Sequence, residues 1–189
     1  MPASSLRIIR LHPRDAESLR RFRLKSIDDD PLANRLNAEE EQRVSSAELI
    51  ARIHGPTGSE RFVLVAHERS DTEAFDEQGW IGLCGFFRQP GASTRHLGWF
   101  WGLNVLPSWR RRGVAGALLQ AALHNASTIP DIVQAQVRIA TDNAAGRRTF
   151  EQAGFTQVAV LPRALRIGST DVDEGLFIRP IAGSIGGSS

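Results

Sequence analysis

The sequence predicts a mixed α/β fold, in which one β-sheet carries helices on both of its faces. Short segments rich in branched and aromatic residues alternate with segments of helical periodicity along the chain. One helical segment connects two strands, which requires a parallel, right-handed crossover between them. We therefore expect a sheet that is mixed in direction, with helices packed on both sides.

The N-terminal segment predicts one strand followed by two helices. Leu6–Leu11 has β character, and Asp15–Ile27 places apolar side chains near one helical face. Asn37–Arg43 mixes acidic and basic residues, and we expect it to be a loop or a solvated helical turn. Ser45 and Glu48 have the spacing of a capping box, which opens a second helix.

The middle of the chain predicts three consecutive strands. These strands are Phe62–His67, Trp80–Arg88 and His96–Val105, of which the last is richest in aromatic and branched residues. A polar connection, Ser70–Gln78, separates the first two. Pro107 ends the third strand.

The C-terminal half predicts two helices that alternate with strands. A helix from about Gly113 to Ser127 has an apolar face suited to packing on a sheet. Strand Ile132–Ala140 and a short helix, Asn143–Ala153, follow it. Phe155–Leu161 and Asp171–Ile178 are the last two strands.

Bulk composition is that of one ordinary globular domain. The chain has 189 residues, of which 41% are hydrophobic and 23% charged, and its formal net charge is +2. Residues 1–181 are expected to form the domain, and the Gly/Ser-rich residues 182–189 a mobile tail. The low net charge argues against nucleic acid as a partner.

The expected location is the cytoplasm. Cys84 is the single cysteine, so no intrachain disulfide can form. No apolar run is long enough to span a bilayer, and no secretory signal is visible at the N-terminus. We therefore expect neither a membrane partner nor, from the residues present, a metal site.

The segment after the third central strand has the features of a diphosphate-binding site. A strand ends and a helix begins around Gly113, Ala115 and Gly116, which have little or no side chain to block a ligand from the backbone. The first turn of a helix has free amides and a partial positive charge. The three arginines Arg110–Arg112 precede it. Such a segment binds anions, although small residues also occur at helix starts for packing alone.

This segment resembles the cofactor loop of the GNAT superfamily of acyl-CoA-dependent N-acetyltransferases. Arg110-x-x-Gly113-x-Ala115 matches the Q/R-x-x-G-x-G/A signature, and Val105-x-Pro107 matches its lead-in. The resemblance implies that backbone amides of Arg111, Arg112, Gly113, Val114, Ala115 and Gly116 hold the pyrophosphate of coenzyme A. It also implies that Leu103, Asn104 and Val105 pair with the pantetheine arm, and that one of their amides polarises the thioester carbonyl.

A second segment carries the same resemblance independently. Residues 139–155 are similar to the family pattern V-x-x-x-N-x-x-A-x-x-L-Y-x-x-x-G-F, in which Asn143 contacts the cofactor arm. From the residues alone, Asn143 is equally a helix N-cap. The strand from Trp99 to Val105 and the late Asp171–Glu174 are also similar to a "WG-x-x-V" subgroup of largely unassigned substrate.

The resemblance sharpens the expected fold and function. It implies a single GNAT-type domain with six to seven strands, about four flanking helices and splayed central parallel strands. The implied activity is transfer of an acetyl or other acyl group from acetyl-CoA to an amine of a small molecule, protein or peptide. Family dimers are common, so a homodimer is also compatible with it.

The usual acid–base residues of the family are missing. Phe150 stands at the position of the tyrosine that serves as the acid in many members, and the chain has no tyrosine. Trp99 and Arg138 stand where carboxylate bases often lie, and neither can be a general base near neutral pH. Other groups or solvent must then act, or the domain binds acyl-CoA without turnover as a regulatory or interaction module.

Two residues are candidate substitutes for the missing base. Glu174 lies on the late strand that borders the acceptor site in the family, and alternation places Asp173 on the opposite face. His96 has a suitable unperturbed pKa but begins its strand, which is typical of a solvated residue. Glu174 is otherwise a surface or structural carboxylate. Cys84 has apolar neighbours, which favour a buried, inert thiol.

The acceptor itself is not predicted by any one residue. Trp99 and Trp101 either present an aromatic wall to a cationic amine or lie in the core. The acidic residues Asp28–Asp30 and Glu39–Glu41 either attract such an amine or keep a loop soluble.

Overall fold

The computed structural model of the chain describes residues 6–30, 37–55, 60–68 and 79–181. Seven strands form one sheet in the order β1-β2-β3-β4-β5-β7-β6. The strands are β1 Leu6–Arg10, β2 Arg61–Glu68, β3 Trp80–Arg88, β4 Leu97–Val105, β5 Gln134–Ala140, β6 Thr156–Ile167 and β7 Thr170–Pro180. All are antiparallel to their neighbours except β4 and β5, which are parallel. The mixed α/β sheet is therefore confirmed.

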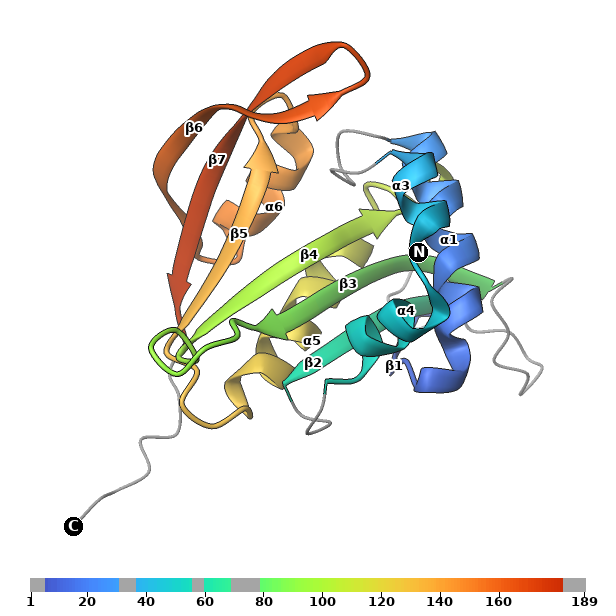
Figure 1. Cartoon of the computed structure of the whole chain (residues 1–189), viewed down its shortest axis with the longest axis horizontal. Coiled ribbons are helices and arrows are strands. Elements are labelled where there is room, and N and C mark those ends of the chain that lie inside the picture. The colour runs from blue at the N-terminus through green and yellow to red at the C-terminus, as the bar shows by residue number, and fades with distance from the viewer. Residues whose placement is uncertain (1–5, 31–36, 56–59, 69–78, 182–189) are drawn as a thin grey trace.

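Five α-helices cover the two faces of the sheet (Figure 1). They are α1 Ala16–Asp29, α3 Ala38–Arg43, α4 Ser46–Ile53, α5 Val114–Ser127 and α6 Ala144–Gln152, with short 3-10 turns η2 at Pro13–Asp15 and η4 at Pro107–Trp109. In Figure 1, α1, α3 and α4 lie over one face, and α5 and α6 lie over the other. Each face buries its own apolar cluster, one against α1 and α4 and one against α5 and α6. No helix in the described ranges is long and apolar enough to cross a membrane.

The two central strands diverge after a short parallel contact. β4 and β5 pair only at Leu97, Gly98 and Trp99, and within the described ranges the rest of β4 has no partner strand on that edge. Figure 1 shows β5, β6 and β7 turning away from β4 beyond this point. The expected splay of the central parallel strands is therefore confirmed, and it leaves free backbone groups on the edge of β4.

Local sequence signals set the boundaries of the helices correctly. Ser45 accepts a hydrogen bond from the Glu48 amide at 3.2 Å, and the Glu48 carboxylate accepts one from the Ser45 amide at 2.8 Å. This is the expected capping box at the start of α4. Gly113 precedes α5 with φ of 81°, a left-handed conformation that glycine adopts without strain.

Two segments differ from the sequence-based expectation. Asn37–Arg43 was expected to be a loop or a solvated helical turn. The helical alternative is correct, because Asn37 caps α3, but Glu41 is fully buried rather than solvated. β6 continues to Ile167 rather than ending at Leu161, with an irregularity in its pairing between Leu161 and Leu165. Residues 70–78 and 182–189, for which a polar connection and a tail were expected, lie outside the described residues.

Candidate functional site: a cavity between the splayed strands and α5

A cavity of about 700 Å³ opens where β4 ends and α5 begins. It is lined by α5, by the diverging edge of β4 and by one side of α6. The lining residues are Asp30, Leu103, Asn104, Val105, Trp109, Arg110, Arg111, Gly113, Val114, Ala115, Gly116, Gln120, Asn143, Ala145, Gly146, Arg148, Thr149, Gln152 and Ala153. The cavity therefore gathers the two sequence segments that carried the family resemblance.

The helix end at the cavity has free amides and an open approach. The first intrahelical bond of α5 is donated by Ala117 to the Gly113 carbonyl at 3.0 Å, so the amides of Val114, Ala115 and Gly116 have no intrahelical acceptor. A Cβ built on Gly113 or Gly116 meets no atom within 4 Å. An anionic group can therefore approach this backbone closely.

The three arginines before α5 have different roles. The Arg110 side chain donates from Nε to the Val105 carbonyl at 3.0 Å and pairs with Asp30 at 3.2 Å, which ties the turn to the end of β4 and of α1. Arg111 is exposed and lines the cavity. Arg112 lies over the Trp109 ring at 4.9 Å and is not among the lining residues.

Asn143 caps α6 and also lines the cavity. Its side-chain oxygen accepts a hydrogen bond from the Gly146 amide at 2.8 Å, so the N-cap interpretation holds. Its position between β5 and α6 places the same side chain at the cavity wall. The other α6 residues that line the cavity are Ala145, Gly146, Arg148, Thr149 and Gln152, which repeat with helical spacing along one side of the helix.

Asn104 is the polar group in this cavity with unmet hydrogen bonds. Its side chain is 5% exposed, and neither its amide nitrogen nor its oxygen has a partner among the described residues. Buried amides are nearly always hydrogen-bonded, because a buried polar group without a partner costs free energy. A ligand that offers one donor and one acceptor would satisfy it.

The structure places the catalytic candidates away from this cavity. His96 is exposed and precedes β4, at the opposite end of that strand from Leu103. Glu174 is fully buried on β7, opposite Ala140 and Leu161, and is not among the lining residues. Asp173 accepts a hydrogen bond from the Arg163 amide at 2.7 Å.

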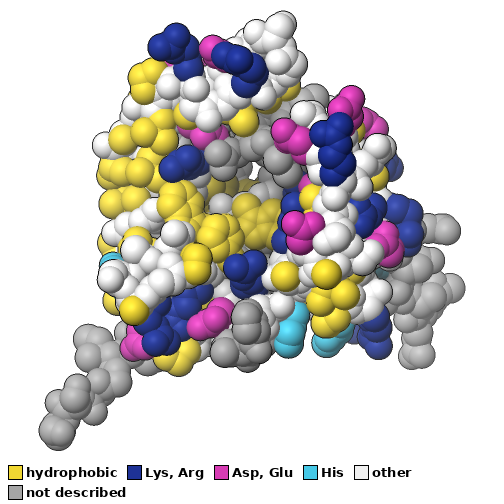
Figure 2. Space-filling view, in the orientation of Figure 1, with side chains coloured by type: hydrophobic (Ala, Val, Ile, Leu, Met, Phe, Trp, Pro, Cys, Tyr) yellow, Lys and Arg dark blue, Asp and Glu magenta, His cyan; other side chains and the backbone are white. Residues whose placement is uncertain are grey.

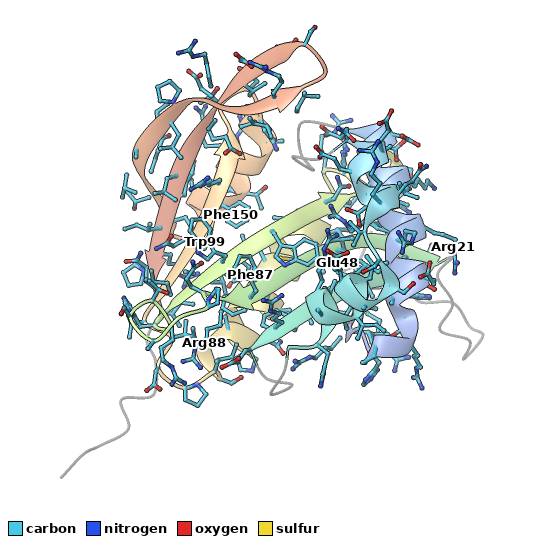
Figure 3. All side chains as sticks on the ribbon, viewed as in Figure 1. Arg21, Glu48, Phe87, Arg88, Trp99 and Phe150 are labelled. Atoms are coloured by element: carbon cyan, nitrogen blue, oxygen red, sulfur yellow. The ribbon has the colours of Figure 1, made fainter. Side chains whose placement is uncertain are left out.

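The other residues singled out by sequence are structural. Phe150, labelled in Figure 3, is 4% exposed and packs edge-on against Phe155. Its phenyl ring has no group that could donate a proton. Burial raises the pKa of the Cys84 thiol to about 12, which makes it a poor nucleophile. Among the described residues no group of three metal-ligating side chains comes together.

Comparison with known proteins identifies the class and then the family. The fold is that of an α/β protein with a cavity that opens at the free amides of a helix start. The sequence profile of the acetyltransferase (GNAT) domain matches residues 5–156. The chain therefore belongs to the GNAT acetyltransferase family. No curated protein sequence matches it.

Solved structures share this fold at low sequence identity. A GNAT acetyltransferase from Streptococcus pneumoniae is 19% identical with a TM-score of 0.74, and the match covers 93% of this chain and 99% of that one. A phosphinothricin acetyltransferase from Sinorhizobium meliloti, solved with acetyl-CoA, is 18% identical with a TM-score of 0.75, covering 98% and 94%. A putative acetyltransferase from Salmonella typhimurium, also with acetyl-CoA, is 15% identical with a TM-score of 0.74, covering 98% and 99%.

Proposed function

We propose that this protein is an N-acetyltransferase that transfers an acetyl or related acyl group from acetyl-CoA to an amine in a ternary complex. The observation that carries the proposal is the cavity of about 700 Å³ that joins the free amides of α5 to the unpaired edge of β4. The family membership and the relatives solved with acetyl-CoA support the same assignment.

The residues of the cavity fit the parts of acetyl-CoA. The amides from Val114 to Gly116 and the exposed Arg111 suit the pyrophosphate, because both bring positive charge to one point. The free edge of β4 at Leu103–Val105 suits an extended chain with amide groups. A backbone amide on this edge is positioned to polarise the thioester carbonyl as an oxyanion donor.

The reaction then requires little or no covalent catalysis by the protein. The acceptor nitrogen attacks the thioester carbonyl, the C–N bond forms and the C–S bond breaks, and the nitrogen gives its proton to a base or to water. The thiolate leaves with a pKa near that of cysteine, so water can protonate it. No covalent intermediate on the protein is required, in keeping with the buried Cys84.

Asn104 provides a direct test of cofactor binding. Asn104→Leu removes a buried amide that has no partner, so the free protein should keep or gain thermal stability. Affinity for acetyl-CoA should fall roughly tenfold, because a hydrogen-bonded contact is lost. Calorimetric titration measures the affinity for acetyl-CoA, and thermal unfolding of the same samples measures the stability. Unchanged affinity in the variant would remove Asn104 from the proposed site.

Acyl transfer itself is tested with acetyl-CoA and a panel of amines. We expect thiol release that depends on the amine, an acetylated product by mass spectrometry, and intersecting initial-velocity lines rather than the parallel lines of a covalent intermediate. Glu174 does not line the cavity at α5, but register places it on the sheet face of Arg138 and Trp99, opposite the face of α5, and we propose it as the base for an acceptor that enters from that face. Glu174→Gln should lower kcat/KM at least tenfold, a conservative threshold against the roughly 10²–10⁴-fold that a general acid or base contributes. His96→Ala, at the far end of β4, is the control and should leave kcat/KM unchanged.

The alternative is an acyl-CoA-binding regulatory or interaction module without turnover. The buried Phe150 in place of the usual tyrosine motivates it. Tight acetyl-CoA binding with no amine-dependent thiol release across the panel would favour this alternative and refute the transferase proposal.

A further inference from the structure

A second, smaller cavity lies on the opposite face of the sheet from α5. It has a volume of about 290 Å³ and is lined by Arg52, Arg61, Phe87, Pro90 and Trp101. It shares no lining residue with the cavity at α5. Figure 2 shows this face hollowed between the β5–β7 arm and the helices α3 and α4, with hydrophobic side chains on its floor and basic side chains around it.

The position of this cavity relates it to the proposed transfer reaction. Trp101 is two residues before Leu103 on β4, and Leu103 lines the cavity at α5. Only Gly102, whose φ of 64° turns the chain, separates the two residues, so the two cavities flank the same short stretch of β4. Phe87 pairs with Trp99 in the same sheet face, which continues the aromatic floor between the two strands (Figure 3).

The walls of the smaller cavity are held in place before any ligand arrives. The Trp101 indole lies directly on Gly85: a Cβ built on Gly85 would come within 2.1 Å of that ring, so the contact requires glycine. Arg52 donates two hydrogen bonds to Glu41, at 2.9 and 3.1 Å. Such fixed walls lower the entropic cost of binding.

Arginine side chains outnumber their carboxylate partners in and behind this cavity. Arg23 and Arg52 share the single carboxylate of Glu41, with both ion pairs at 2.9 Å. Arg61 has no carboxylate within ion-pair distance among the residues that the structure describes. Among the described residues, these three guanidinium groups therefore have one carboxylate within ion-pair distance, and Glu48 adds a longer-range attraction to Arg52.

The aromatic rings cannot serve a cationic acceptor here, because arginines already occupy them. The guanidinium carbons of Arg23 and Arg52 lie 5.2 and 6.0 Å from the Trp101 ring, and that of Arg61 lies 5.8 Å from the Phe87 ring. These contacts use the negative ring faces, and a further cation would be repelled by the three arginines. The aromatic wall predicted for a cationic amine is thus covered by the protein's own cations.

We propose that this cavity binds the carboxylate of the acceptor, so that the acceptor is an amine that also carries a carboxylate and an apolar body. The inference rests on the proposed transferase function and names its acceptor class. Arg61 and Arg52 offer planar donor groups that match a carboxylate, and Pro90 with the ring edges of Phe87 and Trp101 gives the cavity apolar lining for the rest of the ligand. The small volume favours a free amino acid over a folded protein surface.

The test compares ligands that differ only in the carboxylate. Phenylalanine should be acetylated with a kcat/KM at least tenfold higher than phenylalaninamide. Arg61→Met keeps the apolar stem and removes the charge, so it should abolish this preference while the KM for acetyl-CoA stays unchanged. Arg7→Met, a change at an exposed arginine of β1, is the matched control and should retain the preference.

A binding measurement makes the test independent of turnover. N-acetylphenylalanine should bind the wild-type protein at least tenfold more tightly than its amide by calorimetry, and Arg61→Met should bind both alike. Equal binding of acid and amide by the wild type would overturn the carboxylate site even if transfer occurs. Carboxylate-dependent binding without any acyl transfer would support the site and refute the transferase function.

Discussion

Replacing Glu41 by alanine should lower the free energy of unfolding by about 3–5 kcal/mol, the cost of leaving a buried charge without its partner. The Arg23 side chain is 2% exposed and its Nε donates to Glu41 at 2.9 Å. Without that carboxylate its guanidinium stays buried beside Trp101 with no counter-charge. Such a loss is a large part of the roughly 5–15 kcal/mol that stabilises a domain. Urea unfolding followed by circular dichroism measures it.

A matched control lies two residues away in the same helix. Glu39 pairs with Arg43, but their side chains are 78% and 76% exposed, so Glu39→Ala should change stability very little. The double change Arg23→Met with Glu41→Leu should recover much of the loss, because it removes both charges and keeps apolar volume. A destabilisation by Glu39→Ala as large as that by Glu41→Ala would contradict this account.

The same carboxylate should make stability depend on pH. Burial acts to raise the pKa of Glu41, but the hydrogen bonds and charges of Arg23 and Arg52 outweigh it, so the pKa lies below its usual value of 4.5. The folded state therefore binds its proton less readily than the unfolded state does. The stability that the ionised Glu41 carboxylate gives the folded state is fully present above pH 4.5. It is lost as the pH falls through the lower pKa that Glu41 has in the folded state. Glu41→Ala should show a weaker dependence than the wild type in this range.

Glu41 also shows which parts of the structure sequence patterns could not predict. The run from Asn37 to Arg43 has the composition of a solvated segment, and only its local capping is visible in the sequence. The burial of Glu41 depends on arginines 18 residues before and 11 residues after it. Local patterns do not encode such a tertiary contact.

The cavity at α5 was more predictable because its signals are local. A strand end, a positive-φ glycine and a run of small residues follow each other directly at Gly113, and the N-cap Asn143 precedes its helix directly. The smaller cavity is assembled mainly from β2, β3, β4 and α4, so Arg61 and Phe87 meet only in the folded chain. The extension of β6 was missed because Pro162 and the left-handed Arg163 interrupt its pattern.

Replacing Gly116 by glutamate should weaken acetyl-CoA binding by roughly 100-fold, through repulsion of the phosphates at the start of α5. Gly116 is exposed, lines the cavity and has open space where a Cβ would lie, so the new side chain would enter the site without a clash. The substitution should not lower the stability of the folded protein. Glutamate favours helix more than glycine does, and an acidic group in the first turn interacts well with the helix dipole. Affinity and stability should therefore change in opposite directions.

The isosteric Gly116→Gln separates the effect of charge from that of size. It should gain similar helix stability and bind acetyl-CoA at least tenfold more tightly than Gly116→Glu, with the gap narrowing as salt screens the repulsion. Gly116 suits this test better than Gly113, whose φ of 81° would strain any side chain and confuse folding with binding. Calorimetric titration with acetyl-CoA and thermal unfolding give both quantities. Wild-type affinity in a folded Gly116→Glu variant would mean that this helix start does not hold the phosphates.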